Sequence, residues 1–238
     1  MKRVAGRDRA GATALAVAIA LLAWAGSATA APAATPAASP GATSAAPSAA
    51  TPEARAIFAG GCFWCVEAAF DEVDGVLGTT SGFVGGHVEN PTYAQVSAGG
   101  TGHAEAVLVV YDPKRTTYEH LLDVFWHNVD PLAAGRQFCD VGDQYRSAIF
   151  WLDEEQHRAA LASKEALLRD GRLHGRIVTE ILPAGRFWPA EEYHQDYHRK
   201  NPARYRYYRW SCGRDARLRE VWGEAAPHGD GPHGESAH

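Results

Sequence analysis

The sequence predicts a two-layer α+β sandwich, in which helices cover one face of a mixed or antiparallel sheet. Segments typical of strands and of helices alternate between residues 53 and 223. Two strands follow one another directly after the first helix, an order that suits antiparallel pairing. About 170 residues are also enough for a single domain with one hydrophobic core.

The first predicted strand and helix meet at a cysteine. Residues 56–59 are apolar and typical of a short buried strand, and residues 66–70 are helix formers. Cys62 therefore falls in the first turn of the helix, after two glycines that permit a sharp turn. Free backbone N–H groups and the positive end of the helix dipole stabilise a thiolate there. Cys62 is a candidate nucleophile, and a buried structural cysteine is the alternative.

The remaining elements follow from periodicity and from helix caps. Alternating side chains place Glu105 on one face of a strand that Asp112-Pro113 ends. Asp153 indicates the start of a helix, and Gly171 fits its end. The further strands are expected at residues 76–84, 103–111, 145–152 and 177–182, and the further helices at residues 118–128, 153–170 and 190–200.

The two ends of the chain predict segments outside the folded domain. Residues 1–30 have the pattern of a secretory signal peptide, with four basic residues, an uncharged apolar stretch and Ala28-Thr29-Ala30. Residues 31–52 are rich in Ala, Pro, Ser and Thr, which is typical of a flexible linker. The polar tail at 224–238 is expected to be disordered. We therefore expect secretion across the inner membrane and a periplasmic or other extracytoplasmic location.

Charge and composition exclude some classes of partner. Removal of the signal peptide takes away four positive charges and one negative charge, so the formal charge changes from −5 to −8. An acidic mature chain argues against nucleic acid as a partner. The apolar stretch is short and no stop-transfer pattern follows, so a retained membrane anchor is less favoured. The one methionine is the initiator, and its absence elsewhere suits exposure to oxidants, although codon bias explains it equally.

Several short motifs occur in an order that resembles a known family. They are Gly61-Cys62-Phe63-Trp64, Pro91-Thr92-Tyr93, Gly102-His103-Ala104-Glu105, Asp140, Gln144-Tyr145-Arg146-Ser147 and Tyr193-His194-Gln195. In combination they resemble peptide methionine sulfoxide reductase type A, although any one motif alone is weak. The resemblance covers residues 55–223 and implies a ferredoxin-like core. It also implies reduction of methionine S-sulfoxide, free or protein-bound, in the repair of oxidised exported proteins.

The resemblance implies a thiol mechanism without a bound cofactor. Cys62 would attack the sulfoxide sulfur as a thiolate and become a sulfenic acid. A second thiol would condense with it, and an external thioredoxin-like dithiol would reduce the disulfide. Glu105 is the expected proton donor, because partial desolvation would raise the pKa of its carboxyl. Glu105 could equally hold the proton that Cys62 loses, and a solvated strand carboxylate is the structural alternative.

Other expected site residues surround the nucleophile. In the family pattern Tyr93 and Tyr145 are hydroxyl donors to the sulfoxide oxygen, and Asp140 is a carboxylate that orders the site. The chain has nine tyrosines, so either phenol could instead be structural. The residues expected to contact the substrate are Phe63, Trp64 and His194. The aromatic pair beside Cys62 equally suits plain core packing.

The other three cysteines leave the identity of the second thiol open. Cys212 is the first choice, because resolving cysteines of the family usually lie in the C-terminal segment. Cys65 is one helical turn from Cys62 and is the second choice, although many members carry glycine there. Cys139 is the third choice. A structural bridge between Cys65 and Cys139 is a further possibility in an oxidising compartment.

Two rival functions and a metal site are weaker predictions. Cys62-x-x-Cys65 could belong to a thiol–disulfide oxidoreductase that acts on protein disulfides. The domain could also bind oxidised methionine segments without turning them over. His194 and His198 stand four apart in the last predicted helix, but no second Cys pair accompanies them, so we expect no metal. We expect a monomer.

Overall fold

The computed structural model describes residues 53–223. The predicted signal peptide, linker and C-terminal tail lie outside the described residues. Within residues 53–223, the helices are too short or too polar to cross a bilayer. The predicted α+β class is confirmed, since helices pack against a mixed sheet.

A six-stranded sheet forms the centre of the described domain. Its strand order is β7-β6-β1-β3-β2-β8. The strands are β1 (Ala54–Gly60), β2 (Val76–Val84), β3 (Ala104–Tyr111), β6 (Ser147–Trp151), β7 (Glu180–Pro183) and β8 (Trp188–Pro189). Neighbouring strands are antiparallel except β6 and β7, which are parallel. The sheet is therefore mixed.

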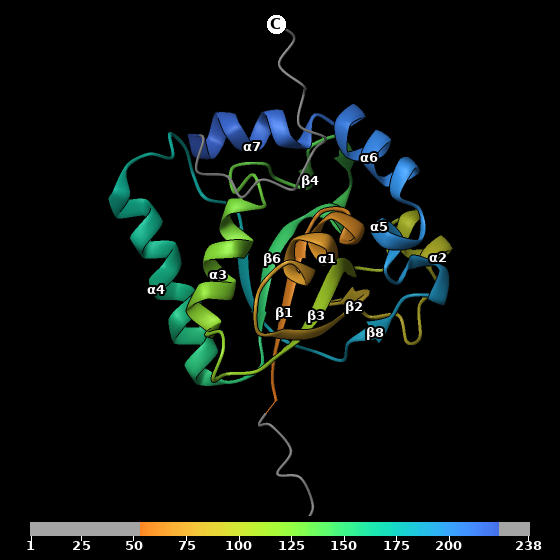
Figure 1. The fold of residues 1–238 in the computed structure, drawn as a ribbon, viewed down its shortest axis with the longest axis horizontal. Helices are drawn as coiled ribbons and strands as arrows, with labels where there is room; N and C mark the ends of the chain where they lie inside the picture. The colour runs from red at the N-terminus through yellow and green to blue at the C-terminus, as the bar shows by residue number, and fades with distance from the viewer. Residues whose placement is uncertain (1–52, 224–238) are drawn as a thin grey trace, which may run out of the picture. The chain divides into compact units, whose positions relative to one another are not determined.

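The helices that cover the sheet lie on one face. They are α1 (Phe63–Asp71), α3 (Tyr118–His127) and α4 (Glu154–Asp170). The chain order β1-α1-β2-β3-α3-β6 with the spatial order β6-β1-β3-β2 is that of a ferredoxin-like core. Figure 1 shows α1 and α3 in front of the strands. Phe58, Phe70, Leu121 and Phe125 belong to the main core between these helices and the sheet, which anchors α1 rigidly on the strands.

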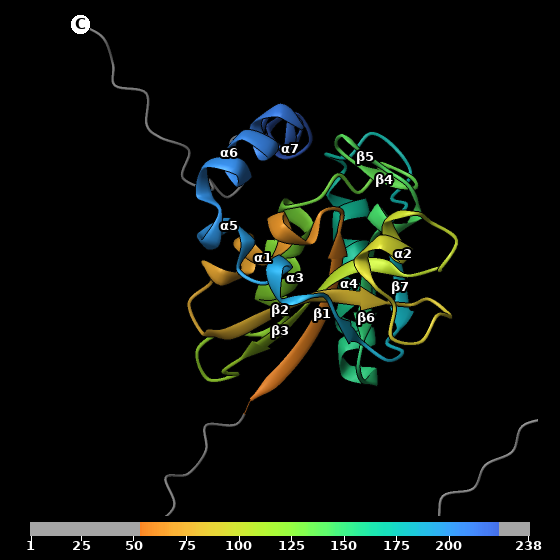
Figure 2. The ribbon, with the colours of Figure 1, turned by 90° about the vertical axis from the view of Figure 1, so that its right-hand side faces the viewer.

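The C-terminal segment differs from its prediction. One helix was expected over residues 190–200, but the chain forms a 3₁₀ turn (Glu192–His194), breaks at Asp196 and continues as α5 (Tyr197–Lys200). Asp196 has a left-handed backbone, with φ of 52°. The expectation that His194 and His198 share one helix face is therefore wrong. Two further helices, α6 (Pro202–Ser211) and α7 (Arg214–Trp222), were not predicted. They lie beyond one end of the sheet in both Figure 1 and Figure 2.

Several predicted boundaries agree closely with the structure. Asp153 caps α4 by accepting a hydrogen bond from the backbone N–H of Gln156, and Gly171 ends the helix with φ of 73°. The strand predicted at 177–182 begins only at Glu180, where it pairs with β6. Short elements that were not predicted complete the domain: α2 (Tyr93–Ser97), β4 (Arg136–Gln137), β5 (Asp140–Val141) and a 3₁₀ turn (Asp143–Tyr145).

Candidate active site

Cys62 is the N-cap residue of α1, two residues after the end of β1. Its backbone precedes the helix, and its side chain makes no cap hydrogen bond to the N–H groups of the first turn. Gly61 has φ of 84°, and a Cβ built there would come within 2.5 Å of Cβ of Gln137. The turn therefore requires glycine on both conformational and steric grounds. Cys62 is only 6% exposed, which places the thiol in a largely water-free site.

Glu105 lies on β3 and faces the start of α1, as its strand register predicted. Its carboxylate accepts a hydrogen bond from the backbone N–H of Phe63 at 3.1 Å. Only 2% of the residue is exposed. Burial raises the pKa of the carboxyl to about 8, although the Phe63 N–H opposes the shift. Glu105 therefore holds a proton at neutral pH beside Cys62.

Cys62 and Cys65 form a buried pair of free thiols on consecutive turns of α1. Burial raises the pKa of the Cys62 thiol, and the contacts with Cys65 and Glu105 add to this. A hydrogen bond from Cys62 lowers the pKa of Cys65 to about 6, and the positive charges of Arg214 and Arg209 act in the same direction. The pair consequently shares one proton at neutral pH, with Cys65 the more acidic sulfur.

Two tyrosine side chains approach the same place from separate segments. Tyr93 begins α2, and Tyr145 ends the 3₁₀ turn that precedes β6. Burial, together with the nearby Glu105 and Cys62, raises the pKa of Tyr93 to about 12. Burial and Glu105 likewise raise the pKa of Tyr145, with contributions from Asp140 and Cys62. Both phenols therefore stay protonated and can donate a hydrogen bond to an anion that forms at Cys62.

The predicted substrate residues form an aromatic cluster beside Cys62. The Trp64 indole Nε1 donates a hydrogen bond to Nδ1 of His194 at 3.1 Å. Trp64 also stacks on Tyr197, with ring centroids 3.8 Å apart. The Phe63 ring contacts His194 and Tyr93, at centroid distances of 5.0 and 6.2 Å. Burial lowers the pKa of His194, so the ring is neutral and can accept the indole N–H.

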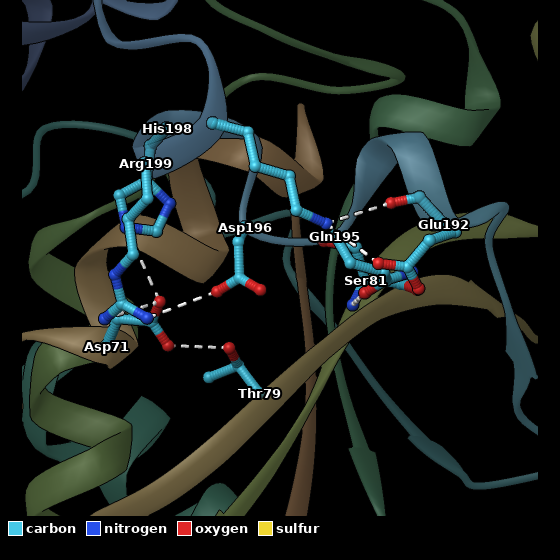
Figure 3. Close-up of polar contacts among 9 residues, drawn as sticks. Asp71, Thr79, Ser81, Glu192, Gln195, Asp196, His198 and Arg199 are labelled. Carbon is cyan, nitrogen blue, oxygen red and sulfur yellow. Dashed lines mark hydrogen bonds and ion pairs between the residues drawn. The ribbon is translucent and has the colours of Figure 1, made fainter.

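Polar contacts fasten residues 192–200, which carry half of this cluster, to α1 and β2 (Figure 3). The Gln195 amide accepts from the N–H of Ser81 at 2.8 Å and donates to the carbonyl of Ser81 at 2.9 Å. Asp71 on α1 forms an ion pair with Arg199 at 3.1 Å. Gln195 thus pairs with β2 as a strand neighbour would, which explains why no continuous helix forms there.

Glu67 on α1 is a buried carboxyl that the sequence analysis did not single out. It is 1% exposed. Burial raises its pKa to about 7, although contacts with the Asp196 backbone and the Ser81 hydroxyl lower it. Its Oε2 has no hydrogen-bond partner among the described residues. Glu67 therefore sits between α1, β2 and the turn at Asp196 as an incompletely satisfied group.

Asp140 is reached by side chains from the C-terminal helices. The Tyr208 hydroxyl of α6 donates a hydrogen bond to the Asp140 carboxylate. Burial raises the pKa of Asp140, whereas this hydrogen bond and the charge of Arg214 lower it. Arg214 is 2% exposed and donates to the carbonyls of Gly60 and Asn128 at 3.3 and 2.6 Å. Tyr208 and Arg214 were not predicted as site residues, because neither belongs to a recognisable motif.

The cysteines pair differently from the possible Cys65–Cys139 bridge. Cys139 is joined to Cys212, with Cα atoms 4.9 Å apart, and both Cys62 and Cys65 are free. Cys212 is therefore not available to Cys62 in this state. Cys139, Asp140 and Cys212 form the group of potential metal ligands found in the described part of the chain. Because both sulfurs are joined in a disulfide, neither can coordinate as a thiolate. This group of residues therefore does not fit a thiolate-bound metal.

Comparisons with known proteins agree with this geometry. A family model described as peptide methionine sulfoxide reductase matches residues 54–226. The chain is 50% identical over 168 residues to the peptide methionine sulfoxide reductase MsrA of Bacillus licheniformis, covering 71% of this chain and 93% of that protein. It is 56% identical over 150 residues to MsrA of Methanothermobacter thermautotrophicus, covering 63% and 89%.

Solved structures show the same fold. Methionine sulfoxide reductase A of Corynebacterium diphtheriae matches with a TM-score of 0.59 and 40% identity, covering 63% of this chain and 76% of that one. Mxr1 from Saccharomyces cerevisiae in reduced form matches with a TM-score of 0.60 and 31% identity, covering 63% and 87%. Sequence and structure therefore point to the same set of relatives.

Proposed function

This chain belongs to the peptide methionine sulfoxide reductase family, and from that premise we propose that Cys62 reduces methionine S-sulfoxide by attacking its sulfur. The enzyme is an oxidoreductase that acts on methionine sulfoxide with a disulfide-forming pair of cysteines. The observation that carries the mechanism is the placement of Cys62 at the N-terminus of α1 beside the protonated Glu105. Nucleophile and acid thereby meet in one dry site.

The proposed first half-reaction transfers the sulfoxide oxygen to Cys62. The thiolate attacks the sulfur, Glu105 gives its proton to the oxygen, and methionine leaves as the sulfide. Cys62 becomes a sulfenic acid, and Glu105 becomes a carboxylate. Tyr93 and Tyr145 would donate hydrogen bonds to the oxygen as its negative charge increases. Each of these groups is buried or partly buried, so the hydrogen bonds form with little competition from water.

The aromatic cluster supports a role in substrate binding. Phe63 and Trp64 would pack against the methyl group of methionine, and His194 would hold the Trp64 indole in place. Selection of the S epimer follows from the fixed directions of attack and of proton donation, because the R epimer would exchange the positions of oxygen and methyl. Free and protein-bound methionine sulfoxide present the same group and are both proposed substrates.

We propose Cys65, in place of the first-ranked Cys212, as the thiol that resolves Cys62. Cys65 lies one turn away and contacts Cys62 directly, and its pKa of about 6 makes it a thiolate at neutral pH. Its attack on the Cys62 sulfur would expel hydroxide, which leaves as water after gaining a proton, and would form a disulfide. A thioredoxin-like dithiol would then reduce this disulfide. No bound cofactor is required by these steps.

The sequence of residues 1–30 supports the proposal that the enzyme is exported and repairs oxidised proteins in the periplasm. The alternative function, oxidoreduction of protein disulfides through Cys62-x-x-Cys65, is disfavoured by the protonated Glu105 and the two phenols, which a disulfide exchange does not need. We also expect the enzyme to act as a monomer.

The test uses the mature protein, excess dithiothreitol and the separate S and R sulfoxides of a capped methionine, with Cys62→Ser alongside. The expected result is formation of sulfide from the S form only, and its loss in the variant. Reduction of a model protein disulfide without any sulfide would instead favour the alternative. Stoichiometric binding of the sulfoxide by Cys62→Ser, with no product from the wild type, would favour a binding module.

A further inference from the structure

The Tyr208 hydroxyl lies between the nucleophile and a second carboxylate. It donates a hydrogen bond to Asp140, and its contact with Cys62 lowers the pKa of that thiol. The ring meets the Trp64 indole edge-on, with centroids 5.8 Å apart. A single phenol of α6 therefore touches both the reacting sulfur and an acid that the first half-reaction does not use.

A covalent link holds this arrangement in place. Cys139 directly precedes Asp140, and the N–H of Cys212 donates to the carbonyl of Tyr208 at 2.9 Å. The Cys139–Cys212 disulfide thus joins the two segments that carry Asp140 and Tyr208. The contact between the phenol and the carboxylate is built from residues far apart in sequence, so it depends on this closure.

The two carboxyls of the site differ in the groups that surround them. Glu105 keeps its proton at neutral pH, since burial raises its pKa to about 8. It cannot accept a second proton from Cys62. For Asp140 the cation of Arg214 and the Tyr208 hydroxyl oppose the effect of burial. Asp140 accepts the Tyr208 hydroxyl and is the carboxyl placed to take a proton through that phenol.

We propose that Tyr208 is a further catalytic residue, whose hydroxyl relays the proton of Cys62 to Asp140 as the nucleophile forms. The S–H bond of Cys62 breaks and a new O–H bond forms on Tyr208. The original O–H proton of Tyr208 passes to Asp140. Cys62 keeps the electron pair as a thiolate, Tyr208 stays neutral, and Asp140 becomes a neutral acid. The phenol then donates its new O–H to the thiolate. This step rests on the proposed role of Cys62.

Cys65 is the competing acceptor for the same proton. It contacts Cys62 and could take the proton directly. A protonated Cys65 could not attack the sulfenic acid in the next step, however, since only the thiolate is nucleophilic. The relay leaves Cys65 as a thiolate that can attack the sulfenic acid. The other groups that affect the titration of Cys62 and Asp140 are Glu105 on β3, Tyr208 on α6 and Arg214 on α7.

The experiment compares Tyr208→Phe, Asp140→Asn and the double variant in a Cys65→Ser background, which removes the competing acceptor. Tyr207→Phe is the matched control, because Tyr207 lies on the same helix and is 68% exposed. Single-turnover formation of sulfide from the S-sulfoxide is measured from pH 6 to 10. Circular dichroism melts check the fold of each variant.

The relay predicts a rate about 100-fold lower for each single variant at neutral pH, and no further loss in the double variant. The deficit shrinks as the pH rises, because hydroxide then deprotonates Cys62. Tyr207→Phe keeps the rate of its background. If Asp140 acted only through its charge, Asp140→Asn would react faster than its parent, because a negative charge near the thiolate would be removed. That result, or a deficit that does not vary with pH, would overturn the relay.

Alkylation by iodoacetamide gives a second measurement that needs no sulfoxide. Peptide mass spectrometry measures the alkylation rate of Cys62 alone. The relay predicts that the variants rank in the same order by this rate as by the rate of sulfide formation. Equal rates in all variants contradict the relay. Absence of sulfide from the parent enzyme, with alkylation still ordered as expected, would count against the proposed function and leave the relay intact.

Discussion

The backbone N–H of Phe63 and the carboxylate of Glu105 meet at 3.1 Å, which joins the first turn of α1 to the middle of the sheet. The N–H favours the charged carboxylate, but burial raises the pKa to about 8 despite it. The start of α1 thus carries both Cys62 and the N–H group that holds its acid partner.

Glu105→Gln should lower the single-turnover rate about 100-fold or more, because the sulfoxide oxygen loses its proton donor. In the wild type the protonated fraction of Glu105 falls as the pH rises through about 8. The wild-type rate should therefore decline above that pH, and the variant should lack this decline. Glu155→Gln, an exposed change on α4, is the control. A full rate in Glu105→Gln would exclude it as the acid.

Thiol counting should identify the working cysteines. Denatured protein from oxidant-free storage without reductant should react with a maleimide at Cys62 and Cys65 only, since Cys139 and Cys212 are joined. After one turnover with sulfoxide, no free thiol should remain. Cys65→Ser should instead accumulate a sulfenic acid, trapped by dimedone. A disulfide between Cys62 and Cys212 after turnover would restore Cys212 as the resolving thiol.

Glu67→Gln should change the pH dependence of stability. The folded-state pKa of Glu67 is raised to about 7, so its contribution is fully present below the unfolded pKa of about 4.5. That contribution is lost as the pH rises through about 7, because the folded state must ionise a buried acid. The Tm of the variant minus that of the wild type should be larger at pH 8 than at pH 5. Glu165→Gln, exposed on α4, should show the same difference at both pH values, and equal behaviour of Glu67→Gln would refute the assignment.

Gln195→Ala should both destabilise the domain and weaken substrate binding. The change leaves the N–H of Ser81, a fully buried residue, without its acceptor, whereas the Ser81 carbonyl keeps its hydrogen bond from the Ala190 N–H. The expected cost is about 2 kcal/mol in the free energy of unfolding, measured in urea. Since residues 192–200 hold His194 and Tyr197 against Trp64, KM should rise more than kcat falls. Glu192→Gln, which breaks an exposed ion pair with Lys200, should cost less than about 0.5 kcal/mol. Similar effects of both changes would show that the Gln195 pairing is unimportant.

Local signals predicted some parts of the fold well. The cap at Asp153 and the glycine at 171 bound α4 correctly, and strand alternation placed Glu105 on the inner face of β3. These features depend on neighbours in the sequence. The helix expected at 190–200 failed because Gln195 pairs with β2, more than 100 residues earlier, and no local pattern reveals that partner.

The candidate site was predictable only where its residues belong to motifs. The residues that lie in the quoted motifs are Cys62, Tyr93, Glu105, Asp140, Tyr145 and His194. Tyr208 belongs to no motif and lies on a helix that was not predicted. The spacing of Tyr208 and Cys212, one turn apart, and Pro202 at the first helical position could have suggested α6. The Cys139–Cys212 pairing could not have been derived, because disulfide connectivity depends on tertiary structure.

The buried guanidinium of Arg214 sets a limit on how far this protein can be shortened. It supplies donors to the carbonyls of Gly60 and Asn128, and Trp222 near the end of α7 donates to the carbonyl of Val129 at 2.9 Å. A truncation ahead of α7 would leave three buried acceptors without donors, one of them two residues before Cys62. The last helix of the described domain thus supports the backbone that carries the nucleophile. Expression trials should place the C-terminal boundary after residue 223.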